Sequence, residues 1–353
     1  MISQQLRLAW QPARMDRHNG KRITLSDVAL LAGVSSQTVS RVVNNHPYVS
    51  EDTRRRVLTA IRKLDYRPNR AARSLATRRS CTLGVVSYDI AFYGPAQMVM
   101  NIEQTAKRRG YTVSLATTER MALDEVRQAV IDVGGEAMDG LLFIAPVAGV
   151  SYADLVSVCG NVPFVQIDTE LSAKVPSVVI DQRYGSYLAT QHLIDLGHRD
   201  MVEISGPLTW YGAQARHTSW RDTLLAAGLT PGLSVEGDWT ARSGYEAAHR
   251  LLATGAQFTA LVVGNDQMAL GAIAALREHG LGVPDDVSVV GFDDVPEAAY
   301  FAPPLTTIRQ NFAALGEQSV EYLITLVENP DTPVHQRVLY PQFVERQSTR
   351  PLV

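Results

Sequence analysis

The sequence predicts a small all-α unit near the amino terminus and a larger α/β core built on parallel sheets. Residues 24–66 contain three short segments in which apolar side chains recur at helical spacing. From residue 82 onward, short apolar runs alternate with amphipathic segments, which is typical of buried parallel strands joined by helices. The length of 353 residues agrees with two or three domains.

The first helical segments have the spacing of a helix-turn-helix. Thr24 is predicted to cap a helix, and Gly33 to form the turn after it, because glycine tolerates a positive φ. Ser35 is predicted to cap a second helix over 36–43. Ser50 opens a third, which ends before a proline at position 68.

The charge is distributed unevenly along the chain. Residues 1–80 carry 16 Lys and Arg and 5 Asp and Glu, a balance of +11, whereas the other 273 residues carry 17 and 31, a balance of −14. A compact basic unit binds the phosphates of nucleic acids, since it displaces their counterions. The side chains expected on the outer face of the second helix suit this partner. Gln37 can pair with two atoms of adenine and Arg41 with two of guanine in the major groove.

Seven apolar runs are predicted to be strands of the core. Polar residues follow several of them directly, notably Asp168, Asn265 and Asp293. Parallel sheets bind ligands beyond the carboxyl ends of their strands, so these side chains are candidate ligand contacts. The predicted strands are 82–87, 112–116, 140–145, 163–167, 201–204, 260–263 and 287–292.

Several classes of protein are not favoured. No apolar run is long enough to span a membrane, and no secretory signal is evident, so a cytoplasmic location is expected. The nucleotide-binding, hydrolase and zinc-protease motifs are missing, which argues against an enzyme, and no cofactor is expected. Cys81 and Cys159 are expected to be small buried hydrophobes. Residues 1–21 are expected to form a disordered extension, and either Met1 or Met15 can be the natural start.

The sequence resembles the LacI/GalR family of repressors over roughly residues 22–350. The resemblance implies a helix-turn-helix head (about 22–67), a hinge helix or linker (68–80), and a periplasmic-binding-protein-like core (81–353) of two Rossmann-like lobes. It places lobe 1 at about 81–180 and 310–339, and lobe 2 at about 181–309 and 340–351. The motifs are TLSDVALLAGVSSQTVSRVVN (24–44), YRPNRAARSLA (66–76), GPL (206–208), EGDWTARSG (236–244), GNDQMALGA (264–272), VSVVGFDD (287–294) and PPLTTI (303–308).

The resemblance also implies DNA contacts at individual positions. It assigns base reading to Ser36, Gln37 and Arg41, and insertion into the central minor groove to Leu75, with Ala72 beside it. The implied partner is a near-palindromic operator bound by a homodimer. The positions implied to contact the phosphate backbone are Thr24, Ser35, Thr38, Asn44, Ser50, Thr53 and Asn69.

A sugar effector is implied between the two lobes. Carboxylates and guanidinium groups bind vicinal hydroxyls in bidentate fashion, and an aromatic ring packs on the apolar face of a pyranose. Ile144, Ile180 and Gly212 depart from the polar or aromatic residues of a family member, which implies a differently shaped pocket. The implied effector positions are Phe92, Pro95, Met98, Arg120, Asp168, Arg216, Trp239, Asn265, Asp293, Gln310 and Phe312.

Three alternatives remain open at this point. Rossmann-like lobes also host catalysis, and an exported sugar-binding protein has the same core. The direction of the response is also open, since purine-responsive relatives use a ligand that tightens DNA binding. The sequence favours a repressor of sugar-utilisation genes that a galactoside-like sugar or another glycoside releases from DNA.

Overall fold

The computed structural model describes residues 23–43, 46–66, 79–120, 122–144, 150–171 and 175–352. The chain divides into two compact units, which meet in sequence between Arg78 and Arg79. Each unit is treated separately here. Among the described residues, no helix has both the length and the apolar character that crossing a bilayer requires.

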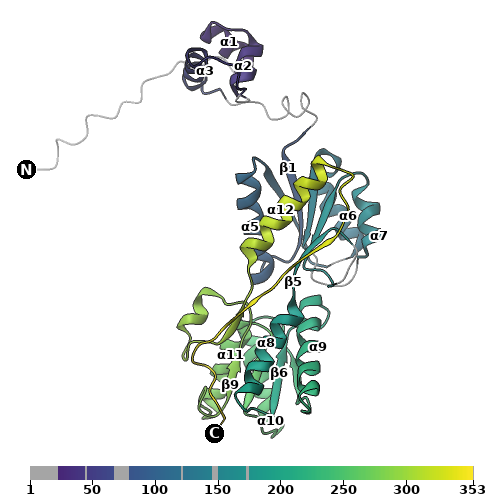
Figure 1. The fold of residues 1–353 in the computed structure, drawn as a ribbon, viewed down its shortest axis with the longest axis vertical. Helices are drawn as coiled ribbons and strands as arrows, with labels where there is room; N and C mark the ends of the chain where they lie inside the picture. The colour runs from purple at the N-terminus through teal and green to yellow at the C-terminus, as the bar shows by residue number, and fades with distance from the viewer. Residues whose placement is uncertain are drawn as a thin grey trace, which may run out of the picture. The chain divides into compact units, whose positions relative to one another are not determined.

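The amino-terminal unit contains three helices, α1 (Leu25–Ala32), α2 (Ser36–Val43) and α3 (Glu51–Lys63) (Figure 1). Thr24 caps α1 in a capping box with Asp27, and Gly33 ends it at a φ of 62°, as predicted for the turn. Val28, Val39 and Val57, one from each helix, are completely buried together. The predicted helix-turn-helix is therefore confirmed.

The first sheet of the core has six strands in the order β11-β5-β4-β3-β1-β2. Every neighbouring pair is parallel, as the continuously apolar runs predict. The strands are β1 (Thr82–Tyr88), β2 (Thr112–Thr118), β3 (Gly140–Ile144), β4 (Phe164–Ile167), β5 (Ser177–Ile180) and β11 (Gln336–Leu339).

Helices cover both faces of this sheet (Figure 1). On one face, α5 (Tyr93–Arg108) and α12 (Phe312–Glu328) lie side by side and share a hydrophobic cluster with the strands. On the other face, α6 (Leu123–Asp132) and α7 (Tyr152–Cys159) form a second cluster, and the short η1 (Gly135–Ala137) follows α6. Two covered faces explain why the central strands β3, β4 and β5 are buried along their whole length.

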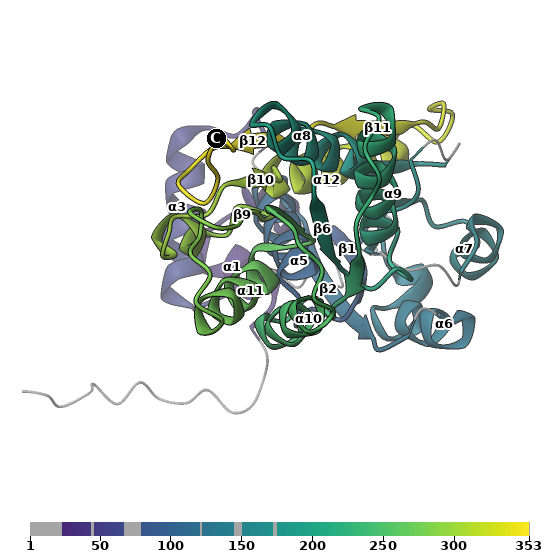
Figure 2. The same ribbon diagram turned by 90° about the horizontal axis from the view of Figure 1, so that it is seen from below.

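The second lobe repeats this layered arrangement around a sheet of order β7-β6-β8-β9 (Figure 2). One buried cluster joins helices α8 and α9 to this sheet, and another joins α10 and α11. The elements are β6 (Met201–Ser205), β7 (Ser234–Glu236), β8 (Ala260–Val263), β9 (Ser288–Val290), α8 (Gln182–Asp195), α9 (Tyr211–Ala226), α10 (Ala241–Ala253), α11 (Asp266–Glu278) and η2 (Pro296–Tyr300).

Within the described part of the core, the chain passes between the two lobes three times. It leaves the first sheet after β5 and enters α8, and it returns between β10 (Thr307–Arg309) and α12. The third passage joins β11 to β12 (Gln342–Val344), which pairs antiparallel with β10. The predicted fold class, an all-α head with an α/β core of two parallel-sheet lobes, is confirmed.

All seven predicted runs contain strands, but β5, β7, β10, β11 and β12 were not predicted. Each of these strands contains polar residues and at most three consecutive apolar ones, so no apolar run stands out in the sequence. Cys159 is buried, as predicted, whereas Cys81 is only half-buried, and both thiols are free.

Candidate functional site

The outer face of α2 carries the three predicted base-reading side chains. Val39 and Val42 turn inward and are buried, whereas Ser36, Gln37 and Arg41 are exposed. One turn of helix separates Gln37 from Arg41, so their side chains share one face. The helix thus presents an amide and a guanidinium group together to solvent, which is the arrangement that major-groove reading requires.

Three of the predicted phosphate-contacting residues are helix N-caps. The hydroxyl groups of Thr24, Ser35 and Ser50 each accept a hydrogen bond from the backbone N–H three residues further on. These residues therefore mark the amino termini of three helices, where N–H groups and the helix dipole attract phosphate. Thr38 and Thr53 pair with two of these caps. Asn44, Asn69, Ala72 and Leu75 lie outside the described residues.

A cavity of about 540 Å³ lies in the core and is lined by residues from both lobes. Ten of the eleven predicted effector residues line it, from loops and helix ends that are far apart in the sequence. They are Phe92, Pro95, Met98, Asp168, Arg216, Trp239, Asn265, Asp293, Gln310 and Phe312.

Arg120 is the predicted effector residue that does not line this cavity. Its side chain is 75% exposed, and its Nε donates to Glu125 Oε1 at 2.7 Å. An exposed arginine held by a neighbouring carboxylate gains nothing from turning inward, because it would lose both water and its partner. Arg120 therefore belongs to the surface in this structure.

Arg216 forms the centre of a polar network in the cavity wall. Its Nε donates to Gln182 Oε1 at 2.9 Å, and Nη2 lies 3.8 Å from Asp293 Oδ1. Gln310 connects the ends of this network, since its amide donates to Asp293 at 2.6 Å and accepts from Gln182 at 2.8 Å. The guanidinium group also lies 3.7 Å from the centre of the Phe292 ring. These contacts hold a charged group in place before any ligand binds.

The carboxyl groups of the cavity resist ionisation. Burial raises the pKa of Asp293 to about 6, although Arg216 and the hydrogen bond from Gln310 lower it. Burial also raises the pKa of Asp168, again against the effect of Arg216. The same desolvation lowers the pKa of the Arg216 guanidinium. A ligand that donates hydrogen bonds to these carboxylates would therefore bind best when they are ionised.

The affinity for a ligand whose hydroxyls donate to Asp293 should fall in mild acid. A hydroxyl donates a stronger hydrogen bond to the ionised carboxylate of Asp293 than to its protonated form, so the pKa of Asp293 is lower in the bound state than in the free state. The affinity therefore has its full value above the free-state pKa of about 6. Below that pH it falls by up to about tenfold for each pH unit. Titration calorimetry from pH 8 to pH 5 would measure this. Asp293→Asn should flatten the profile, and an equally flat profile in the parent protein would contradict the assignment.

Aromatic rings form a further part of the wall, beside Arg216, whose guanidinium carbon lies 5.6 Å from the centre of the Trp239 ring. The Trp239 ring meets Trp210 edge to face at 5.6 Å between centroids, and Trp210 contacts Phe92 at 5.3 Å in the same manner. Gly206 makes room for the indole, because a Cβ there would lie only 2.1 Å from Trp239. The glycine of the GPL motif thus positions the aromatic surface.

Two buried polar atoms of the cavity residues have no hydrogen-bond partner among the described residues. They are the indole Nε1 of Trp239 and the Oε1 of Gln267. An unpaired buried donor or acceptor costs about 1–3 kcal/mol, which a ligand that pairs with it removes. Both atoms are shielded from solvent in this structure, so a ligand pairs with them only if the cavity wall moves.

Sequence reasoning missed several residues that line the cavity, among them four with large polar or aromatic side chains. Gln182 follows the short strand β5, which the apolar pattern did not indicate. Tyr93, Trp210 and Gln267 begin or precede helices and follow no periodic pattern. Conversely, Asp266 and Asp294 also come after apolar runs, but neither lines the cavity, and their carboxylates form contacts that stabilise the fold. Asp266 accepts from Thr307 at 2.6 Å, and Asp294 pairs with Arg309 and Arg346.

A helix-turn-helix unit and a two-lobed core with a polar cavity define the class of ligand-responsive DNA-binding regulators. Family models match at both ends of the chain. Residues 24–69 match the bacterial regulatory proteins of the lacI family, and residues 190–349 match the periplasmic binding protein-like domain.

Individual relatives agree over nearly the whole chain. The lactose operon repressor of Escherichia coli is 37% identical over 329 residues, covering 93% of this chain and 91% of the relative. The transcriptional repressor PurR of Haemophilus influenzae is 35% identical, covering 94% and 99%. The crystal structure of the lac repressor dimer bound to operator and the anti-inducer ONPF has a TM-score of 0.85 at 37% identity, covering 94% and 100%. The chain is therefore a DNA-binding transcriptional repressor of the lacI family.

Proposed function

We propose that this repressor controls sugar-utilisation genes and that a neutral sugar, galactoside-like or another glycoside, releases it from its operator. The observation that carries the proposal is the pairing, in one cavity, of the buried Arg216–Asp293–Gln310 network with the indole of Trp239. The first group suits vicinal hydroxyls, and the second suits the apolar face of a pyranose ring.

The two lobes provide the switch. The cavity residues come from both lobes, so a ligand there changes the free energy of one lobe arrangement relative to another. If the sugar prefers the arrangement that binds DNA less well, then it lowers operator affinity by the ratio of its affinities for the two states. The reciprocal effect follows, since operator DNA must weaken sugar binding by the same factor.

A homodimer on a near-palindromic operator is the expected complex. The similar lac repressor was crystallised as a dimer on operator, and a two-fold dimer reads two related half-sites. The exposed Ser36, Gln37 and Arg41 would read each half-site, as the family pattern implies. Leu75 and Ala72 are proposed as the minor-groove contacts at its centre.

A purine is the second candidate effector. The similarity to PurR and the rings of Phe92, Trp210 and Trp239 in the cavity favour it, because planar bases stack on aromatic side chains. The two candidates differ in their expected effect on operator affinity, since a purine would raise it and the sugar would lower it.

A thermal-shift panel separates the two candidates. We expect one or more neutral mono- or disaccharides to raise the melting temperature of the full chain, and free purine bases to leave it unchanged, because a ligand that binds only the folded state stabilises it. Stabilisation by a purine, with none by any saccharide, would contradict the proposal.

A further inference from the structure

The chain enters the core through residues 79–82, here called the entry segment, which follow the head in the sequence. Three hydrogen bonds join this segment to one carboxylate, that of Asp139, which directly precedes β3. The backbone N–H and the hydroxyl of Ser80 donate to its Oδ1 at 2.7 and 2.8 Å, and the N–H of Cys81 donates to its Oδ2 at 3.1 Å. A single side chain therefore holds two consecutive residues of the entry segment.

The backbone of the entry segment is also bound to the neighbouring strands. The carbonyl of Cys81 accepts from the N–H of Thr112 at 2.9 Å, and the carbonyl of Thr82 accepts from the N–H of Asp139 at 3.0 Å. Cys81 has a φ of 50°, in the left-handed region that a residue with a Cβ disfavours. A residue keeps this conformation only where its surroundings hold it, so these hydrogen bonds fix the direction of the chain at the core.

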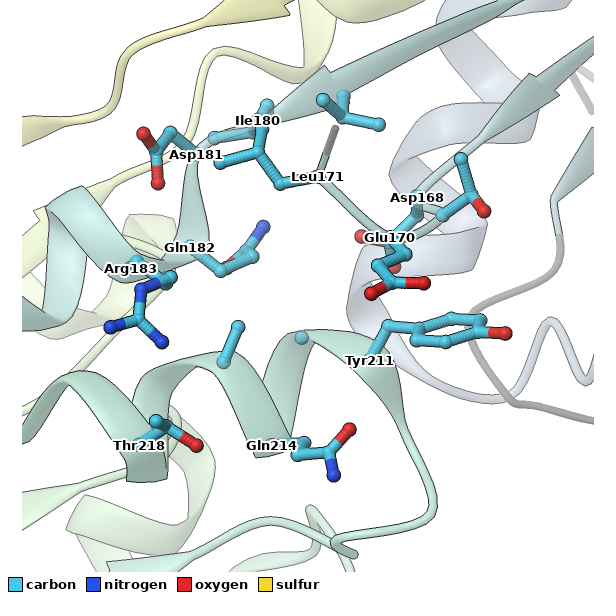
Figure 3. Close-up of a pocket in the computed structure, with 14 residues that line it drawn as sticks. Asp168, Glu170, Leu171, Ile180, Asp181, Gln182, Arg183, Tyr211, Gln214 and Thr218 are labelled. Carbon is cyan, nitrogen blue, oxygen red and sulfur yellow. The ribbon is translucent and has the colours of Figure 1, made fainter. Parts of the chain in front are cut away.

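The entry segment and the ligand cavity lie at opposite ends of the same sheet. A second cavity, of about 360 Å³, adjoins the first, and Figure 3 shows Asp168 and Asp181 in its wall, where β4 and β5 end. The two cavities share Asp168, so both lie at the carboxyl ends of the parallel strands. Asp139 precedes β3 and therefore lies at the amino ends.

Two packed helices of lobe 1 join these ends. α12 begins with Phe312 in the cavity wall and ends with Glu328, whose Oε1 lies 3.3 Å from Nη1 of Arg79 in the entry segment. Its 17 residues extend over about 25 Å. α5 lies so close to α12 that a Cβ at Gly316 would be 2.8 Å from Asn101. Closely packed helices move as one body, so a shift of lobe 1 at the cavity also displaces the entry segment.

We propose that Asp139 is a positioning residue that fixes the entry segment on lobe 1, and that specific operator binding depends on its carboxylate. The inference goes beyond the proposed sugar effector, because it concerns operator binding in the absence of any effector. When the entry segment is already fixed, fewer residues must be ordered as the head binds a half-site. Ordering one more backbone residue on binding weakens the complex by about fivefold or more.

Fluorescence anisotropy, with promoter DNA that the parent protein binds specifically, tests the role of Asp139. Asp139→Ala removes all three hydrogen bonds and should weaken specific binding at fixed salt by about fivefold or more. Nonspecific affinity should stay unchanged, because the head loses no positive charge. Asp139→Asn keeps one acceptor oxygen, so its specific affinity should lie between those of the parent and of Asp139→Ala.

Limited digestion with trypsin measures the entry segment itself. Cleavage after Arg79 should be slow in the parent protein, because the next two residues, Ser80 and Cys81, are held by hydrogen bonds. Asp139→Ala should accelerate this cleavage. Mass spectrometry identifies the product as the core fragment that begins at Ser80.

The matched control is Asp132→Ala. Asp132 is an exposed carboxylate of the same lobe, at the end of α6, and accepts from Gln128 at 2.8 Å. The Asp132→Ala variant should bind operator with the affinity of the parent protein and keep the slow cleavage after Arg79.

Each outcome decides the question. A lower melting temperature with unaltered operator affinity of folded Asp139→Ala would show that Asp139 only stabilises the core, and would refute the proposal. An equal loss of specific and nonspecific affinity would also refute it, because the head itself would then be impaired. If Asp139→Ala does not fold, then Asp139→Asn decides, and a specific affinity equal to that of the parent protein overturns the proposal.

Discussion

Arg41→Ala should abolish specific operator binding while leaving sugar binding intact. The side chain is exposed on α2, away from the buried Val39 and Val42, so the head should still fold. A lost bidentate contact to guanine costs about 1–3 kcal/mol per half-site, and a dimer loses it twice. Fluorescence anisotropy at fixed salt, with DNA from the promoter beside the gene, would measure the loss.

A matched control separates base reading from general attraction to DNA. Lys63 also carries a positive charge on the surface of the same unit, at the end of α3. Lys63→Ala should weaken specific and nonspecific binding by similar factors, because only a phosphate attraction is lost. If Arg41→Ala also weakened specific and nonspecific binding by similar factors, then Arg41 would not be a base reader.

Arg216→Ala should yield a repressor that binds its operator and no longer responds to sugar. The substitution removes the donor to Gln182 and the cation nearest to Asp293, which is only 7% exposed. Hydrogen bonds to charged groups contribute about 1.5–3 kcal/mol, so sugar affinity should fall by about 10–150-fold. Asp293→Ala should have the same effect. Calorimetry with the sugar, and anisotropy with operator DNA, would measure the two functions separately.

The control for this prediction is Arg242→Ala. Arg242 is exposed on α10, forms an ion pair with Glu246, and lines neither cavity. The Arg242→Ala variant should bind sugar and DNA with the affinities of the parent protein. Release of Arg216→Ala from DNA at the sugar concentration that releases the parent would show that the effector binds elsewhere.

The sequence predicted the local structure of the head because its signals are local. Thr24, Ser35 and Ser50 stand at the caps, and the valines recur at helical spacing. In the core, strands within longer apolar runs, such as β3 and β8, were predicted. β5 and β7 were not, since their apolar stretches are only three residues and one residue long. Short strands form through their neighbours in the sheet, which the linear sequence does not show.

Residues of the candidate site were predictable where a polar side chain comes directly after a predicted strand. Asp168, Asn265 and Asp293 each come directly after an apolar run, and all three line the cavity. Gln182 and Trp210 carry no comparable local signal, and only the tertiary fold brings them to the wall. Arg120 was assigned by family pattern alone, and the neighbouring Glu125 holds it at the surface. Distant contacts of this kind depend on the partners that a residue meets after folding.

The central claim is that a sugar in the core cavity controls the DNA-binding head. It is tested most directly by titrating the operator complex of the full chain with the sugar that raises its melting temperature. The account predicts that saturating sugar weakens operator affinity by about 5–150-fold, the usual range of allosteric coupling, and that operator DNA weakens sugar binding by the same factor. A sugar that binds the cavity and leaves operator affinity unchanged, or raises it, would contradict the account.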